Sequence, residues 1–314
     1  MLDIVYPLVS IIVPAYNCEN TIDETLNALI NQKYANYEII IVDDGSTDNT
    51  KTKLSKYENQ IRVITQENAG VAAARNTGIH AARGDWVGFC DADDIWSEHK
   101  LSAQVNCVLT KPEIEMIFCG WWVWSPDEKG VFEVPEDFNT LVCDQYTIDD
   151  ERSGWIYHQL LLDCLCLTST VLIRKSLIDK VGFFDESLKC GEDYDYWLRI
   201  SRITKIVKLK SKYVLYRQHQ QSITRKPHEI NYEYKVLENA IQRWGLKNEN
   251  GQRVDRIKIK RRLAKLNFDF AYNHYKSGNY SVAIKSLMRA IIHEPSWYLP
   301  WGYLFVSLSK LVFK

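Results

Sequence analysis

Three carboxylates lie within four residues at Asp91–Asp94, directly after the apolar run Trp86–Cys90. Like charges this close repel one another, so a compensating group is expected beside them. A hard divalent cation such as Mg²⁺ or Mn²⁺ meets that need, because it prefers carboxylate oxygens and accepts substrate phosphates as further ligands. The alternative is a solvated acidic turn in which Asp94 caps the next helix. The motif by itself leaves both interpretations open.

The elements that position this motif follow from the pattern of the first hundred residues. Short apolar runs rich in β-branched residues predict strands covered on both faces, and a capping box at Thr21 and an Ala-rich run predict helices between them. The resulting βαβαβαβ order predicts a parallel sheet with right-handed crossovers. The strands are expected at Val9–Val13, Tyr37–Val42, Ile61–Thr65 and Trp86–Cys90, and the helices from Thr21 to about Gln32 and at Val71–Ala82.

Polar clusters follow three of these predicted strands, at Ala15–Asn17, at Asp43 and Asp44, and at Asp91–Asp94. Ligands of open parallel sheets bind beyond the carboxyl ends of the strands. We therefore expect the three clusters to converge on one ligand site.

The middle of the chain has a mixed pattern, and one long apolar helix face, Ile230 to Trp244, ends at Gly245. The other predicted elements are strands at Glu115–Val123, Ser169–Ile173, Ile206–Leu209 and Tyr213–Tyr216, and helices at Arg174–Val181 and Tyr196–Ile203.

Composition places the chain among soluble globular proteins, with 314 residues, 46% hydrophobic and 25% charged. The charge is uneven: residues 1–250 carry 27 basic and 37 acidic side chains, whereas residues 251–314 carry 12 and 3. The basic region is helical in pattern, and Phe268–Pro295 resembles one tetratricopeptide helix pair. An anionic partner such as membrane lipid or nucleic acid is one explanation for the basic charge, and docking on the acidic region is another.

The eight cysteines are scattered without CxxC pairs, which favours buried free thiols over a zinc site. The first seven residues do not match a signal peptide. The apolar segment Trp297–Phe313 has 17 residues, short of the ~20 that a bilayer span needs. A cytoplasmic location is the resulting expectation.

Five stretches, taken in order and with their spacing, resemble the family 2 glycosyltransferases. The resemblance covers about residues 8–222 and implies the GT-A fold, an α/β fold with a mostly parallel, Rossmann-like sheet flanked by helices. It implies a catalytic domain at 1–222, a connecting helix at 223–250 and a helical, tetratricopeptide-like region at 251–314. The stretches are Val9–Asn17, Val42–Asp48, Ala73–Gly78, Asp91–Asp94 and Gly191–Asp193.

For the nucleotide, the resemblance implies that Asp44 hydrogen-bonds the base, typically uracil. Pro14, Ala15 and Tyr16 match positions that line the nucleotide pocket, and Arg75 matches a basic residue near the phosphates. The alternatives are that Asp44 is only a turn residue that caps the helix together with a neighbour, and that Arg75 lies on a helix surface.

For the metal, the resemblance implies a DxD signature at Asp91, Ala92 and Asp93, with Mn²⁺ or Mg²⁺ as cofactor. Asp93 matches the direct metal ligand, and Asp91 matches a contact to ribose and metal. His219, in the late stretch Tyr216–Ser222, matches a histidine that reaches the metal or diphosphate, although a lone histidine is also common in ordinary positions.

For proton transfer, Asp193 matches the family's general base. Glu192 and Asp195 lie beside it in sequence, and their like charge favours a raised pKa at the base. One base and one displacement imply inversion at the anomeric carbon. The alternative is that these three acids only cap the helix expected at Tyr196.

The function implied is transfer of one sugar from a nucleotide-sugar, typically UDP-linked, to a glycan or lipid-linked acceptor in surface polysaccharide synthesis. The Gln-x-x-Arg-Trp motif of processive members is absent, because Ala240 stands two positions before Gln242. A non-catalytic adaptor and a nucleotidyltransferase are the alternatives. No nucleic-acid partner is then expected, and residues 251–314 are candidates for peripheral contact with the inner face of the membrane, with packing on the catalytic domain as the alternative.

Overall fold

The computed structural model describes residues 5–138, 140, 146–218 and 228–312. Residue contacts divide the chain into two compact units. The first consists of Met1–Ile156 and Leu165–Gln220, and the second of Tyr157–Cys164 and Gln221–Lys314.

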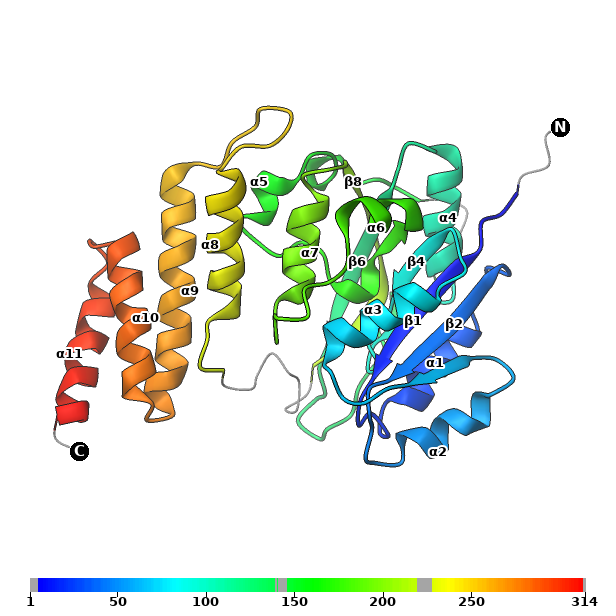
Figure 1. The fold of residues 1–314 in the computed structure, drawn as a ribbon, viewed down its shortest axis with the longest axis horizontal. Coiled ribbons are helices and arrows are strands. Elements are labelled where there is room, and N and C mark those ends of the chain that lie inside the picture. The colour runs from blue at the N-terminus through cyan, green and yellow to red at the C-terminus, as the bar shows by residue number, and fades with distance from the viewer. Residues whose placement is uncertain (1–4, 139, 141–145, 219–227, 313–314) are drawn as a thin grey trace. The chain divides into compact units, whose positions relative to one another are not determined.

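The first unit begins with the predicted parallel β/α repeat (Figure 1). The sheet order β3-β2-β1-β4 is parallel throughout, with Ile11 of β1 opposite Ile39 of β2 and Gly88 of β4. This part of the fold confirms the sequence-based prediction. The elements are β1 (Val9–Ala15), α1 (Ile22–Ile30), β2 (Tyr37–Asp43), α2 (Thr50–Leu54), β3 (Arg62–Thr65), α3 (Val71–Ala81) and β4 (Trp86–Phe89).

The sheet continues beyond β4 with mixed direction, in the order β4-β7-β6-β8-β5. Only β6 and β8 are parallel neighbours in this half; β7 is antiparallel to β4 and β6, and β5 is antiparallel to β8. The elements are β5 (Ile95–Trp96), α4 (Lys100–Thr110), β6 (Met116–Trp124), the 3₁₀ helix η4 (Thr168–Thr170), β7 (Leu172–Arg174), α6 (Lys175–Val181), α7 (Glu192–Ile200) and β8 (Ile206–Arg217).

Several sequence-based expectations in this half are wrong. The strand expected at Ser169–Ile173 begins only at Leu172, after η4. The two strands expected after residue 205 are one strand, β8, which remains paired with β6 through register irregularities around Gly120. The helix expected from Tyr196 begins at Glu192, so that the acidic residues form its first turn. The short strand β5 was not predicted at all, because two residues carry no periodic pattern.

The core of the first unit lies on both faces of β1. On one face Ile11 and Val13 cluster with Leu26 of α1 and with the buried side chains of α4. On the other face α3 approaches so closely that a Cβ added to Gly78 would lie 2.3 Å from Cγ2 of Ile12. Glycine is therefore required at this position, and the close packing fixes α3 against the sheet.

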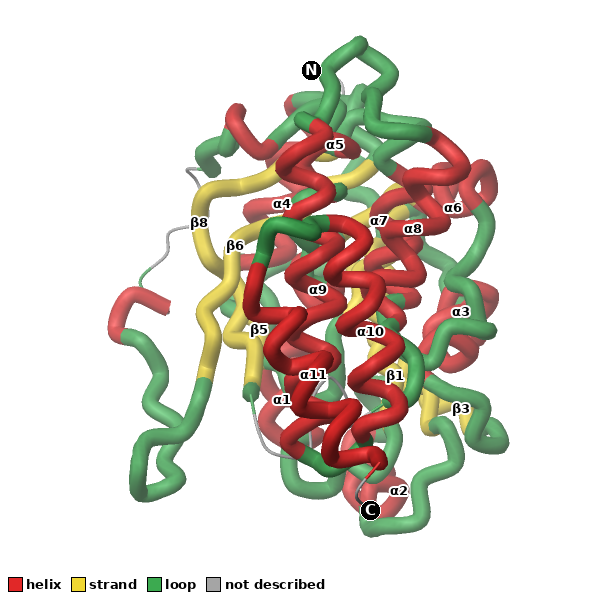
Figure 2. Tube along the Cα trace, turned by 90° about the vertical axis from the view of Figure 1, so that its left-hand side faces the viewer, coloured by secondary structure: helices red, strands yellow, loops and turns green. Residues whose placement is uncertain are grey.

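The second unit is helical, as expected for its C-terminal part. α9 and α10 form an antiparallel pair whose turn places Gly278 at a φ of +76°. Ala271 and Ala283 are fully buried where these helices meet, in a cluster with Leu287. The row α8-α9-α10-α11 is visible in Figures 1 and 2. Its members, together with the short helix α5, are α5 (Tyr157–Leu160), α8 (Tyr232–Trp244), α9 (Arg256–Lys276), α10 (Tyr280–His293) and α11 (Tyr298–Val312).

Within the described ranges, no helix combines the length and the apolar character that crossing a membrane requires.

Candidate functional site

The three polar clusters expected at the sheet edge lie together. They follow β1, β2 and β4, which are neighbours in the parallel half of the sheet. The backbone links them, because the Asp44 amide donates to the carbonyl of Ala15 at 2.8 Å and the Cys90 amide donates to the carbonyl of Ile12 at 3.0 Å.

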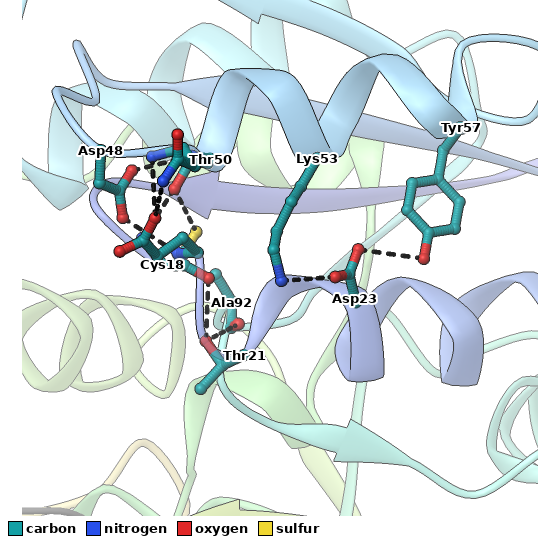
Figure 3. Close-up of polar contacts among 10 residues, drawn as sticks. Cys18, Thr21, Asp23, Asp48, Thr50, Lys53, Tyr57 and Ala92 are labelled. Carbon is teal, nitrogen blue, oxygen red and sulfur yellow. Dashed lines mark hydrogen bonds and ion pairs between the residues drawn. The ribbon is translucent and has the colours of Figure 1, made fainter.

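The loop after β1 is tied to the start of α2 and to the acidic turn by its own polar groups (Figure 3). The Cys18 amide donates to Oγ1 of Thr50 at 2.9 Å, and the Thr21 hydroxyl donates to the carbonyl of Ala92 at 2.9 Å. The predicted capping box at Thr21 is therefore wrong, since no side-chain cap bond forms there. Thr21 instead fixes the acidic turn to the start of α1.

Asp44 is buried and orders the loop that precedes α3. Its carboxylate accepts hydrogen bonds from Nε2 of Gln66 at 2.8 Å and from the amides of Ala69 and Gly70, both at 2.9 Å. Beside it the Tyr16 side chain is half exposed, whereas Ala15 is buried and Pro14 is partly buried. A rigid carboxylate beside an exposed ring is a suitable arrangement for an aromatic base.

Arg75 lies inside the molecule rather than on a helix surface. Its Nη2 donates to Oδ1 of Asp91 at 2.8 Å, and its Nη1 donates to Oε1 of Glu192 at 2.6 Å. Burial raises the pKa of Glu192, and the Arg75 guanidinium offsets part of that rise. Arg75 thus joins the acidic turn to the first turn of α7.

The three carboxylates of the acidic turn have different surroundings. The Asp91 side chain is 30% exposed and Asp93 is partly buried, whereas Asp94 is fully buried. Burial raises the pKa of Asp94 well above its usual value, and the negative charges of Asp93 and Asp91 raise it further. A divalent cation bound beside these carboxylates would offset their mutual repulsion.

Asp94 does not cap the next helix, because α4 begins only at Lys100. Its carboxylate accepts from the Ser169 hydroxyl and from the amide of Arg217, the latter at 3.0 Å. The Ser169 oxygen in turn accepts from the Asp91 amide at 3.0 Å. Asp94 is therefore a buried anchor that holds the turn against η4 and β8.

Arg217, at the end of β8, fixes the same turn from the other side. Its Nε donates to the carbonyl of Asp93 at 2.8 Å, and its Nη2 pairs with Glu24. Its guanidinium carbon lies 4.3 Å from the ring centroid of Trp124, which is thereby part of the packing around Arg217. Sequence reasoning missed Arg217 and Ser169; Arg217 lay within the late stretch that was singled out for His219, whereas nothing marked Ser169.

Asp193 lies in the first turn of α7, and its Oδ2 accepts from Oγ1 of Thr168 at 2.8 Å. The acidic neighbours of Asp193 are both compensated: Glu192 by Arg75, and Asp195 by Arg199 at 2.7 Å. His219 lies outside the described residues.

The donor set suits a cation completed by a substrate. Among residues that the structure describes, no group of three or more His, Cys, Asp or Glu side chains is placed to hold a metal ion. Asp91 and Asp93 supply hard carboxylate oxygens, and Mg²⁺ or Mn²⁺ bound through one or two carboxylates usually takes phosphate oxygens as well. The residues present fit a divalent cation that binds together with a diphosphate.

A family model described as "Glycosyl transferase family 2" matches residues 10–176, more than half of the chain. The chain belongs to this family. Among the curated relatives of this family 2 chain, an Escherichia coli UDP-Glc:alpha-D-GlcNAc-diphosphoundecaprenol beta-1,3-glucosyltransferase, WfgD, is 31% identical over 241 residues, which cover 75% of this chain and 87% of the relative. An uncharacterized glycosyltransferase of Rickettsia prowazekii is 33% identical over 204 residues, covering 64% of this chain. The match spans only 60% of the length of that rickettsial relative.

Solved structures show the same fold. S. aureus TarS 1-349 in complex with UDP-GlcNAc superposes with a TM-score of 0.62 at 20% identity, over 96% of this chain and 87% of TarS 1-349. The mannosyltransferase PcManGT from Pyrobaculum calidifontis, in complex with GDP-Man and Mn²⁺, gives a TM-score of 0.55 at 18% identity, over 99% of this chain and 81% of PcManGT. The expected GT-A fold is thereby confirmed.

Proposed function

We propose that this chain is an inverting, metal-dependent glycosyltransferase. It moves one sugar from a nucleoside diphosphate sugar, here a UDP-sugar, to a hydroxyl of a lipid-linked or glycan acceptor in surface polysaccharide synthesis. The family membership supports the reaction class. The names of the Escherichia coli relatives, which specify UDP-Glc and GlcNAc-diphosphoundecaprenol, support the donor and acceptor classes.

One observation carries the proposal. Thr168 and Ser169 are consecutive residues of η4, and the first contacts Asp193 while the second contacts the backbone of Asp91. Arg75 joins the same two regions through Asp91 and Glu192. The proposed proton acceptor and the proposed metal-binding carboxylates are thus connected through η4 and through Arg75, which supports the proposal because glycosyl transfer needs these groups in a defined relative position.

On the donor side, Asp44 would accept a hydrogen bond from the base, and the Tyr16 ring would lie along it. Asp91 would contact ribose and metal, and Asp93 would be the direct metal ligand. A divalent cation bound there supplies a Lewis acid that stabilises the negative charge on the departing diphosphate. The Arg75 guanidinium, which pairs with Asp91 and Glu192, adds positive charge next to the acidic turn.

On the acceptor side, the Asp193 carboxylate would take the proton from the attacking hydroxyl. The oxygen then forms its bond to the anomeric carbon as the bond from that carbon to the diphosphate breaks. Attack from the side opposite the leaving group inverts the configuration. The hydrogen bond from Thr168 to Oδ2 of Asp193 would orient the carboxylate for this role.

The proposal includes a cytoplasmic enzyme that meets its lipid-linked acceptor at the inner face of a membrane, with peripheral contact through residues 251–314. The basic excess of this region, 12 against 3 acidic side chains, supports it.

The experiment that tests the proposed function is a panel of nucleotide-sugars with Mn²⁺. One UDP-sugar is expected to raise the melting temperature more than the others, because a ligand that binds the folded state stabilises it. That donor is then incubated with a short-chain lipid diphosphate GlcNAc acceptor, and the anomeric configuration of the product is determined by NMR. Absence of stabilisation by every donor contradicts nucleotide-sugar binding, and a product with retained configuration contradicts the inverting mechanism.

A further inference from the structure

The helix α11 carries an exposed apolar stripe on its outer side. Tyr298, Trp301, Phe305 and Leu308 recur at spacings of three, four and three residues, which places them on one face of the helix. Their exposed fractions are 76%, 50%, 75% and 44%. α11 is the last helix in the row α8-α9-α10-α11, so no described helix of this unit covers that face (Figure 2).

A basic face of α9 lies near the start of this stripe. Lys258, Arg261 and Lys265 are exposed and follow one another at spacings of three and four residues, so they share a face. Nε of Arg261 lies 3.2 Å from Oε1 of Glu294, in the turn between α10 and α11. The Trp301 indole N–H donates to the carbonyl of Pro295 in the same turn at 3.0 Å. Arg261 of the basic face and Trp301 of the apolar stripe therefore both contact the α10–α11 turn.

The chemistry of the two faces identifies their partner. A partly apolar surface next to a positive one matches the boundary of a bilayer that contains anionic lipids, where aromatic side chains enter the headgroup region and lysines face phosphates. The indole N–H of Trp301 is already bonded within the protein, so its ring can leave water without an unpaired donor. The excess of nine basic side chains in residues 251–314 gives the attraction that brings this surface to an anionic membrane.

We infer that the α11 stripe and the basic face of α9 form a docking surface for an anionic lipid bilayer. This inference rests on the peripheral contact included in the proposed function, and it names the residues that make that contact. Lipid binding needs neither donor nor metal, so its test separates it from the transfer reaction.

The test is co-sedimentation of the full chain with vesicles of phosphatidylcholine alone and with added phosphatidylglycerol. The chain is expected to bind only the anionic vesicles and to dissociate at high salt, since screening weakens such attraction. The double variant Trp301→Ser/Phe305→Ser is expected to lower the partition coefficient by about tenfold or more, from the lost burial of two large apolar side chains. Lys258→Gln/Lys265→Gln is expected to lower it by about tenfold through the lost charges.

Matched controls come from the first unit, where Val63 and Val131 are exposed apolar residues and Lys129 is an exposed lysine. Val63→Ser/Val131→Ser and Lys129→Gln are expected to bind anionic vesicles like the unchanged chain. Unchanged binding by both α11 and α9 variants, or no binding to anionic vesicles, overturns the inference. It is also overturned if the chain is a dimer in light scattering that Trp301→Ser/Phe305→Ser dissociates, since the stripe would then join two copies.

Discussion

The Thr168 hydroxyl donates a 2.8 Å hydrogen bond to Oδ2 of Asp193, although 25 positions separate the two residues. The next residue, Ser169, contacts both Asp94 and the Asp91 amide. One short 3₁₀ helix, η4, therefore sets the separation between the proposed proton acceptor and the proposed metal-binding turn. Through η4, the hydrogen bonds of Asp193 and of the acidic turn are made by neighbouring residues.

The first prediction concerns Asp193. Asp193→Asn keeps the size and shape of the side chain, but the amide cannot accept a proton as the carboxylate does. We expect the turnover number to fall by about 10²–10⁴-fold, the usual contribution of a general base. Nucleotide affinity, measured by calorimetry with UDP and Mn²⁺, should remain nearly unchanged because Asp193 is proposed to contact the acceptor rather than the nucleotide.

Asp195→Asn is the matched control, since Asp195 lies on the same helix turn and its carboxylate pairs with Arg199. That exchange should leave turnover close to the original value. Unchanged turnover in Asp193→Asn would remove Asp193 as the base.

The second prediction concerns Asp93. Asp93→Ala removes a carboxylate that is proposed to bind the cation directly, so the affinity for UDP should fall in the presence of Mn²⁺ and change little in EDTA. Titration calorimetry in both buffers measures the difference. Asp127→Ala, in an exposed loop, is the control. Equal affinity of the unaltered chain with and without metal would exclude the metal assignment.

The third prediction concerns the buried pair of Arg75 and Glu192. Arg75→Met leaves the Glu192 carboxylate buried without its partner, and breaking such a pair costs about 3–5 kcal/mol of folding free energy. The double variant Arg75→Met/Glu192→Gln should recover the part of that loss that comes from the buried Glu192 charge, whereas the partly exposed Asp91 loses its Arg75 partner in both variants. Urea unfolding of Arg75→Met, Glu192→Gln and the double variant measures the coupling. Additive effects of the two exchanges would show that the pair does not act as a unit.

The fourth prediction compares two serines with equivalent bonding. The Ser169 hydroxyl donates to Asp94 and accepts from the Asp91 amide, while the Ser153 hydroxyl donates to the carbonyl of Asp149 and accepts from the Lys208 amide. Ser169→Ala should cost about 1–3 kcal/mol of stability by leaving buried groups unsatisfied, and Ser153→Ala, at a partly buried site, should cost about the lower end of that range.

Of the two exchanges, only Ser169→Ala should weaken the Mn²⁺-dependent part of UDP binding, because Ser153 makes no contact with the acidic turn. The expected loss is about tenfold, or roughly 1.4 kcal/mol. An equal effect of Ser153→Ala on UDP binding would show that the loss reflects stability alone.

The fifth prediction concerns the buried Lys100 on α4. Burial lowers the pKa of Lys100 to about 8, and its Nζ lies 3.5 Å from the ring centroid of Trp96 and 2.9 Å from Oε1 of Gln104. Between that value and the pKa of about 10.4 of an unfolded lysine, the unfolded chain binds more protons. The contribution of Lys100 to the free energy of unfolding is therefore lowest below pH 8 and rises between about pH 8 and 10.4.

Lys100→Met removes this contribution and keeps a long flexible side chain in the same space. At pH 8 and below, the variant is expected to be the more stable of the two, because the original chain buries a charged lysine. Its advantage in unfolding free energy should shrink by up to about 3 kcal/mol as pH rises from 8 to 10. Chemical denaturation at several pH values measures it. A difference independent of pH would contradict the lowered pKa.

Local sequence patterns were sufficient for much of the fold. The strands β1, β2 and β4 are continuous apolar runs that are buried on both faces, and such runs are recognisable without knowledge of their neighbours. The helical character of residues 256–312 was also predictable, because its apolar residues repeat with helical spacing. The predicted boundaries of α7 and β8 were less accurate. Acidic residues occur both before a helix and in its first turn, and a polar interruption occurs both within a strand and between two strands.

The sequence by itself determined the parallel half of the sheet, the family and the convergence of Asp44 and Asp91–Asp94 on one edge, because a βαβ repeat orders its own strand ends. Only the tertiary structure decided that Arg75 pairs with Glu192, that Asp94 is a buried anchor and that Ser169 and Arg217 hold the acidic turn. These contacts join residues between 75 and 124 positions apart. Periodicity and capping describe neighbours along the chain, whereas long-range pairs form only when the packed sheet brings them within hydrogen-bonding distance.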